Sequence, residues 1–213
     1  MKIYAINGSP RKGWNDAQML DSFKKGVLSL IPDADYQEVF LYDLNYKGCR
    51  SCFGCKLLSL SEPRCAIKDD IYELLHELRH CDGFVFASPI YFSDASAELK
   101  AFFERLMYPG PVIKEIPIHA IYTMNAKKDK FDSVFLPSLS TTHKALEHNF
   151  KTKLNMTCAY YTFQRNNEHL YKPSSHSKPE DKLAYHNLHW ENDLQNAYID
   201  GVHFAEKLLQ IRK

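Results

Sequence analysis

The chain has 213 residues, with 27 Lys and Arg against 26 Asp and Glu, which gives a formal net charge of +1. A balance this even, without a strongly basic run, argues against a nucleic-acid-binding surface. No stretch approaches the roughly 20 apolar residues that a membrane span needs, and the first apolar run, residues 2–6, is too short for a signal peptide. We therefore expect a single cytoplasmic domain over residues 1–213, with neither membrane nor nucleic acid as a partner.

Short apolar runs alternate along the chain with segments of helical periodicity. The runs predict buried strands over residues 2–6, 36–41, 83–87, 116–122 and 156–163. After each strand, apolar residues recur three and four positions apart, which predicts helices within 19–27, 71–78, 99–106, 136–148 and 194–209. We expect Asp69 and Asp70 to cap the second helix, and the polar residues 164–189 to form a long excursion with little regular structure.

This order of elements predicts the fold class. Strand followed by helix, five times over, is typical of a parallel sheet covered on both faces. Right-handed crossovers then require a doubly wound topology, and five strands favour the order 2-1-3-4-5. The prediction is an α/β protein with a flavodoxin-like three-layer sandwich. In such a sheet the ligand crevice lies at the carboxyl ends of the strands, so loops 7–16, 88–95 and 124–130 should meet there.

The first loop carries groups that suit a phosphate. Ser9 and Asn15 can donate hydrogen bonds, Arg11 adds a planar cation, and the following helix offers free backbone amides. A solvated loop capped by Asn15 or Asp16 accounts for the same residues, and the sequence leaves both interpretations open.

Two adjacent aromatics stand out in the second loop. Tyr91 and Phe92 follow the third strand in a segment that should be exposed. They can wall a flat heterocycle, or one of them can cover the next helix. Here too, the residues alone leave both interpretations open.

Four cysteines, Cys49, Cys52, Cys55 and Cys65, form the pattern C-x2-C-x2-C-x9-C. Thiolates at this spacing can hold a [4Fe–4S] cluster, and four thiolates can also hold zinc. Free or redox-active thiols are the interpretation that we favour over both metals.

Five ordered motifs within residues 1–125 resemble the NADPH-dependent FMN reductase family. More narrowly, they resemble its iron–sulfur flavoprotein and multimeric-flavodoxin branch. The motifs are Asn7-Gly8-Ser9-Pro10-Arg11-Lys12, Gly48-Cys49-x-x-Cys52-x-x-Cys55, Cys65-x-Ile67-x-Asp69-Asp70, Ser88-Pro89-Ile90-Tyr91-Phe92 and Lys100-x-Phe102-x-x-Arg105.

The resemblance implies an FMN site with assigned residues. The phosphate would be bound by the first loop, the ring and ribityl chain by the second, and the pyrimidine side by the third. The residues concerned are Ser9, Arg11, Lys12, Asn15 and Asp16, then Pro89, Ile90, Tyr91 and Phe92, then Met124 and Asn125.

The chain departs from the family pattern in two places. Asp16 stands where the family usually has Thr, and a carboxylate beside a phosphate is repulsive unless it faces away. We therefore expect a lowered FMN affinity. The last cysteine spacer, with nine residues, is longer than in the iron–sulfur relatives.

The resemblance implies an FMN-dependent NAD(P)H oxidoreductase, with NAD(P)H as co-substrate and a quinone or other electron-poor small molecule as acceptor. Flavin N5 carries the chemistry, so no side chain is predicted to be catalytic. A non-enzymatic electron carrier, with or without an iron–sulfur cluster, is one alternative; a binding module with a decayed flavin site is another. The resemblance also implies a homodimer or homotetramer, for which residues 164–189 are the expected contact.

Overall fold

A computed structural model describes residues 1–59, 61–163 and 179–212, and its centre is one five-stranded sheet. All strand pairs are parallel, and their order β2-β1-β3-β4-β5 confirms the predicted topology. The strands span Lys2–Asn7 (β1), Asp35–Phe40 (β2), Gly83–Pro89 (β3), Ile118–Thr123 (β4) and Leu154–Ala159 (β5).

Burial follows position in the sheet. Every residue of β3 and β4 is buried, whereas the edge strands β2 and β5 are partly exposed. Within β1 the side chains alternate between two cores, as the two-residue period of a strand requires. Ile3 and Ala5 join one core, and Tyr4 and Ile6 join the other.

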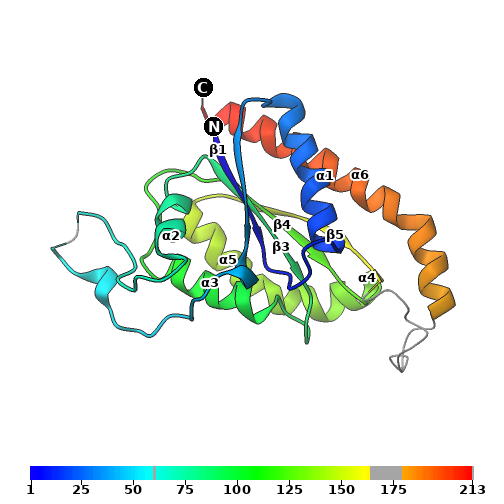
Figure 1. Cartoon of the computed structure of the whole chain (residues 1–213), viewed down its shortest axis with the longest axis horizontal. Helices are drawn as coiled ribbons and strands as arrows, with labels where there is room; N and C mark the ends of the chain where they lie inside the picture. Colours follow the sequence, from blue (N-terminus) through cyan, green and yellow to red (C-terminus); the bar gives the residue numbers. More distant parts are fainter. Residues whose placement is uncertain (60, 164–178, 213) are drawn as a thin grey trace.

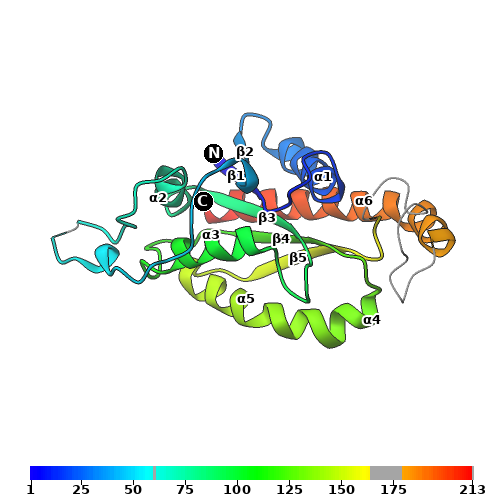
Figure 2. The ribbon, with the colours of Figure 1, turned by 60° about the horizontal axis from the view of Figure 1, so that its bottom comes forward.

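Helices cover both faces of the sheet (Figures 1 and 2). The first core is closed by α1 (Asn15–Leu30) and α6 (Pro179–Ile211), and the second by α2 (Tyr72–Leu78), α3 (Ala97–Met107) and α5 (Leu136–Phe150). A single turn, α4 (Lys128–Lys130), and a π-helical turn over Phe131–Phe135 lead into α5. No helix in the described part of the chain is long and apolar enough to cross a membrane.

The C-terminal third differs most from the sequence-based expectation. The fifth strand ends at Ala159, so residues 160–163 leave the sheet. Of the expected excursion, residues 164–178 lie outside the described residues, and the prediction was wrong for 179–189, which are helical. Pro179 at the helix start and Glu180 and Asp181 in the first turn are N-terminal signals that explain this early start.

The predicted capping of α2 was also wrong. The helix begins at Tyr72, and its N-cap residue Ile71 provides no side-chain cap. The Asp69 carboxylate instead binds Arg105, and the Asp70 carboxylate accepts a hydrogen bond from the Asn45 backbone N–H. The Asp70 carboxylate therefore anchors the segment that carries the four motif cysteines (residues 45–65, the cysteine segment), the Asp69 carboxylate anchors Arg105, and neither caps the helix.

Candidate functional site

A cleft of about 180 Å³ opens at the carboxyl ends of β1, β3 and β4. Its walls come from the segments that follow β1, β3, β4 and β5. The lining residues are Ser9, Arg11, Trp14, Asn15, Asp16, Pro89, Ile90, Tyr91, Thr123, Met124, Asn125, Thr162 and Phe163.

Hydrogen bonds of two buried serines fix the first two loops against each other. The Ser96 hydroxyl donates to the Gly8 carbonyl at 2.7 Å and accepts from the Leu99 N–H, capping α3. The Ser96 N–H in turn donates to the Ser88 hydroxyl at 2.9 Å. One residue thus couples the end of β1, the end of β3 and the start of α3, so the first loop is rigid where it enters the cleft.

The first loop presents a helix N-terminus to the cleft. The N-cap residue of α1 is Trp14, whose side chain accepts no hydrogen bond from the first turn, so the first amides of the helix are available to water or to a bound anion. The Arg11 guanidinium lies over the Trp14 ring at 5.0 Å. Ser9 is buried, and its hydroxyl accepts from the Arg11 N–H at 3.4 Å.

Asp16 lies in the floor of this cleft. It is 3% exposed, and its carboxylate accepts a hydrogen bond from the Thr123 hydroxyl at 3.1 Å. Burial raises the pKa of Asp16 to about 7, although hydrogen bonds from Thr123 and Ser9 and the charge of Arg11 act in the opposite direction. The carboxyl is thus poised to change charge near neutral pH, beside the groups that suit an anion.

The second loop is a tight turn with a strained backbone. The Tyr91 N–H donates to the Asp94 carbonyl and the Asp94 N–H to that of Tyr91, at 2.8 and 3.1 Å. Between them, Phe92 (φ +49°) and Ser93 (φ +70°) are left-handed, which costs a non-glycine residue about 1–2 kcal/mol. The Tyr91 ring turns into the cleft wall, whereas Phe92 is fully exposed.

The far wall carries an acceptor without a partner. Asn125 Oδ1 is buried and has no hydrogen-bond donor among the described residues. The chain is held there by backbone bonds, because the Met124 carbonyl accepts from the Thr162 N–H at 2.9 Å and the Met124 N–H donates to Ala159. A buried acceptor of this kind is costly unless a ligand or a water molecule donates to it.

The structure brings together nine of the eleven residues predicted for the flavin. Lys12 lies outside the cleft, where it pairs with Asp43 at 2.6 Å, and Phe92 points into solvent. Asn15 lines the cleft but donates its side-chain amide to the Phe163 carbonyl at 2.8 Å.

Besides Trp14 of the first loop, the cleft is lined by three residues that were not predicted: Thr123, Thr162 and Phe163. Thr123 is the last residue of β4, where the rule for carboxyl ends of strands could have found it. Thr162 and Phe163 were missed because residues 160–163 were assigned to the fifth strand. The chain instead leaves the sheet after Ala159, and these two residues line the cleft.

The four cysteines of the motif line one small hollow. Cys55 is buried, Cys49 and Cys65 are partly buried, and Cys52 is exposed. Ligand sulfurs of a tetrahedral zinc ion lie about 3.8 Å apart, but no three of these sulfurs lie within 4.8 Å of one another in the described structure. The donor set suits soft metal chemistry, but it is not arranged for a single zinc ion.

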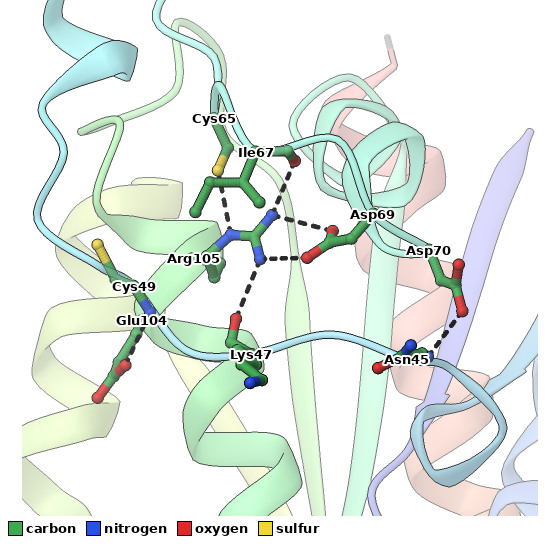
Figure 3. Close-up of polar contacts among 9 residues, drawn as sticks. All are labelled: Asn45, Lys47, Cys49, Cys65, Ile67, Asp69, Asp70, Glu104 and Arg105. Carbon is green, nitrogen blue, oxygen red and sulfur yellow. Dashed lines mark hydrogen bonds and ion pairs between the residues drawn. The ribbon is translucent and has the colours of Figure 1, made fainter.

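A buried arginine joins the cysteine segment to α3 (Figure 3). Arg105 is 1% exposed; its Nε donates to Cys65 Sγ at 3.1 Å, and its two Nη atoms bind both oxygens of Asp69 at 2.8 and 3.1 Å. The carbonyls of Lys47 and Ile67 accept two further bonds. Burial opposes the charge, but the bonds to Asp69 and Cys65 raise the pKa of Arg105. Two sequence motifs far apart in the chain therefore meet at one guanidinium.

A family model described as NADPH-dependent FMN reductase matches residues 1–130. The iron–sulfur flavoprotein of Methanosarcina thermophila is 32% identical over 107 residues, which are 49% of this chain and 52% of that protein. An iron–sulfur flavoprotein of Clostridioides difficile (strain 630) is 32% identical over 121 residues, 53% and 52% of the two chains. The chain thus spans about half the length of these curated relatives.

Solved structures share the fold over almost the whole chain. The NAD(P)H:quinone oxidoreductase from Methanothermobacter marburgensis aligns with a TM-score of 0.66 at 15% identity, covering 95% of this chain and 96% of that one. A flavodoxin from the domain Archaea aligns with a TM-score of 0.52 at 16% identity, covering 98% and 99%. The family model covers more than half of the sequence, so this flavodoxin-like chain belongs to the NADPH-dependent FMN reductase family.

Proposed function

We propose that the protein is an FMN-dependent NAD(P)H oxidoreductase that reduces a small electron-poor molecule such as a quinone. One observation carries the proposal: a single cleft combines an anion site with a buried, unpartnered acceptor. The anion site is the start of α1 with Ser9 and Arg11, and the acceptor is Asn125 Oδ1. FMN carries the matching pair, a phosphate and a ring imide N–H.

The chain's own residues would bind and orient the cofactor. The first loop would hold the phosphate through backbone amides, the Ser9 hydroxyl and the Arg11 guanidinium. Pro89, Ile90 and Tyr91 line the cleft wall with apolar surface that excludes water from one side of a flat ring. FMN, when bound, would supply the chemistry for hydride transfer between NAD(P)H and the acceptor.

The test is an FMN titration followed by anaerobic addition of NADPH or NADH. We expect FMN to bind and its absorbance to bleach with one or both dinucleotides. Arg11→Ala should weaken FMN binding, and Lys12→Ala is the matched control, because Lys12 is a cation of the same loop that lies outside the cleft. Equal weakening by both substitutions would contradict the phosphate site. FMN binding without bleaching would leave the protein a carrier rather than a reductase.

The cysteine hollow favours a second candidate, an electron carrier that holds an iron–sulfur cluster as well as flavin. Four thiols around one hollow and the names of the curated relatives support it. Iron and acid-labile sulfide analysis after anaerobic purification tests it. Both should be present in wild type and lost in Cys52→Ser, but kept in Cys158→Ser, which removes a thiol outside the motif. A protein purified without either would exclude this candidate.

The homodimer or homotetramer implied by the resemblance stays a prediction. Sedimentation velocity over a range of concentrations checks it.

A further inference from the structure

Two histidines and one glutamate converge beside the cysteine segment, away from the groups that line the flavin cleft. Glu62 uses one carboxylate oxygen for each ring, since Oε1 lies 3.1 Å from His76 Nδ1 and Oε2 lies 3.1 Å from His80 Nε2. One ligand atom from each of the three residues lies within 4.8 Å of the others. In a tetrahedral zinc site, nitrogen and oxygen ligands lie about 3.4 Å apart, so small side-chain rotations suffice to receive an ion.

The sequence spacing explains how the histidines meet. His76 lies in the last turn of α2, and His80 lies two residues beyond its end, where the Arg79 and His80 N–H groups donate to the carbonyls of His76 and Glu77 and continue the chain in a tighter turn. Residues at i and i+4 share one face of a helix, and the ring centroids lie 4.6 Å apart. The third ligand is Glu62 in the nine-residue spacer between Cys55 and Cys65.

Residues 76–80 read His-Glu-Leu-Arg-His, which matches the H-E-x-x-H pattern of zinc peptidases. In those enzymes the glutamate is the general base, but here Glu77 accepts a hydrogen bond from the Tyr4 hydroxyl and pairs with Lys2 at 3.2 Å. Glu77 is therefore turned towards β1, and the pattern keeps its two metal ligands without its base. The general base of the zinc-peptidase pattern is therefore turned away from the histidines, whereas the two histidines and Glu62 can still bind a metal ion.

We propose that Glu62, His76 and His80 form a binding site for a divalent transition-metal ion of the Zn²⁺ or Co²⁺ class, which clamps the cysteine spacer onto α2. Two imidazoles and one carboxylate suit such an ion. Three protein ligands leave further positions for water, as in open zinc sites. The side chains are 31 to 50% exposed, so the ion exchanges with solvent.

The surrounding charges permit a cation at this place. The nearby arginines are engaged with other partners: Arg79 donates to the Gly110 carbonyl at 2.8 Å, and Arg64 pairs with Glu73 at 2.9 Å.

The test is equilibrium dialysis of reduced, anaerobic protein against Zn²⁺, with the bound metal counted. We expect one bound Zn²⁺ ion to lose affinity by about tenfold or more in each of three variants, His76→Ala, His80→Ala and Glu62→Gln. Even residues that only support a metal ligand contribute about 10- to 100-fold to metal affinity. His148→Ala is the matched control, since it removes an exposed helical histidine outside the cluster. Circular dichroism of the metal-free variants checks that each is folded.

Co²⁺ separates this site from the cysteines. Thiolate ligands give an intense near-ultraviolet charge-transfer band with Co²⁺, whereas histidine and carboxylate ligands do not. The Co²⁺ ion whose binding the three substitutions weaken should not give this band. Zn²⁺ should also slow tryptic cleavage after Arg64 in wild type but not in His80→Ala. The proposal is overturned if wild type binds no ion beyond those of the cysteines, or if His76→Ala and His80→Ala bind as tightly as His148→Ala.

Discussion

Asp16 is the residue that should govern how the cleft accepts the phosphate of the proposed FMN. It stands where the resemblance leads one to expect Thr, and the structure buries its carboxyl in the floor of the cleft beside Thr123. Burial raises its pKa to about 7. The neutral acid is compatible with a phosphate, whereas the carboxylate repels one, so the departure from the family pattern is a matter of pH rather than a lost site.

FMN affinity should therefore fall as the pH rises. Above pH 7 the phosphate is already mostly dianionic, so a change there reports on Asp16. Because FMN favours the protonated carboxyl, Kd should rise by up to about tenfold per pH unit above pH 7. Asp16→Asn and Asp16→Thr should remove this dependence and bind FMN more tightly at pH 8.5. Fluorescence titrations from pH 6 to 8.5 measure it, and an unchanged slope in Asp16→Asn would contradict the assignment.

Arg105 is a second buried ionisable residue, and its charge is fully paired. Removing it leaves the Asp69 carboxylate, which is 19% exposed, without its cation. We expect Arg105→Met to lower the free energy of unfolding by about 3 kcal/mol or more. Lys100→Met, which breaks the exposed pair with Asp94, should cost less than about 1 kcal/mol. Urea denaturation compares the two, and similar losses would show that the cluster of Figure 3 contributes little.

At the scale of elements, the contact between α1 and α6 depends on two glycines. A Cβ atom at Gly26 would lie 2.0 Å from the Tyr198 carbonyl oxygen, and one at Gly201 would lie 2.1 Å from that of Phe23. Backbone meets backbone at both points, so no side chain can move aside. The close approach fixes how α6 crosses the sheet.

Gly26→Ala and Gly201→Ala should each destabilise the protein by about 2–3 kcal/mol or more, although alanine favours a helix. The clash forces the helices apart, and this outweighs the gain in propensity. Gly13→Ala is the control: no atom lies within 4 Å of the added methyl group, so its effect should stay within about 0.5 kcal/mol. Thermal and urea unfolding measure all three; a neutral Gly26→Ala would refute the tight crossing.

The elements show where sequence patterns suffice. The continuous apolar runs of β3 and β4 predicted buried strands, because such runs are stable only when both faces are covered. The capping prediction for Asp69 was wrong because a carboxylate that can cap a helix can equally pair with a distant cation, here Arg105, and local sequence does not reveal that partner. The end of β5 was misplaced because the aromatic residues after Ala159 look like a continuing strand, whereas Tyr160 packs against Phe131 and Phe163 lines the cleft.

The site was predictable to the extent that topology determines it. Once the strand order is known, the loops after β1, β3 and β4 must converge, and nine of the predicted residues do line the cleft. Lys12 and Phe92 lie outside it because neighbouring residues in a loop point in different directions, and no periodicity tells which. The H-E-x-x-H spacing of His76 and His80 could have revealed this pair, but no local pattern reveals Glu62, the third member of the cluster, which is distant in sequence.

On the scale of the whole molecule, the cleft gathers segments from the beginning, middle and end of the described chain. Asn15 bonds to Phe163, and Asp16 to Thr123, so the walls already tie α1 to β4 and to the segment after β5. A ligand that contacts all four segments binds only the folded state. Occupancy of the cleft should therefore stabilise the entire domain rather than one loop.

FMN at 100 times its Kd should stabilise the protein by about 2.7 kcal/mol, which for a chain of this size corresponds to a rise in Tm of roughly 5–10 °C. Riboflavin has the same ring but no phosphate, so at equal concentration it should raise Tm much less if the first loop grips the phosphate. Differential scanning fluorimetry at pH 6.5, where Asp16 is mostly protonated, makes the comparison. Lys12→Ala should respond to FMN like wild type, and Arg11→Ala should respond less. Equal shifts from FMN and riboflavin would mean that the start of α1 does not bind the phosphate.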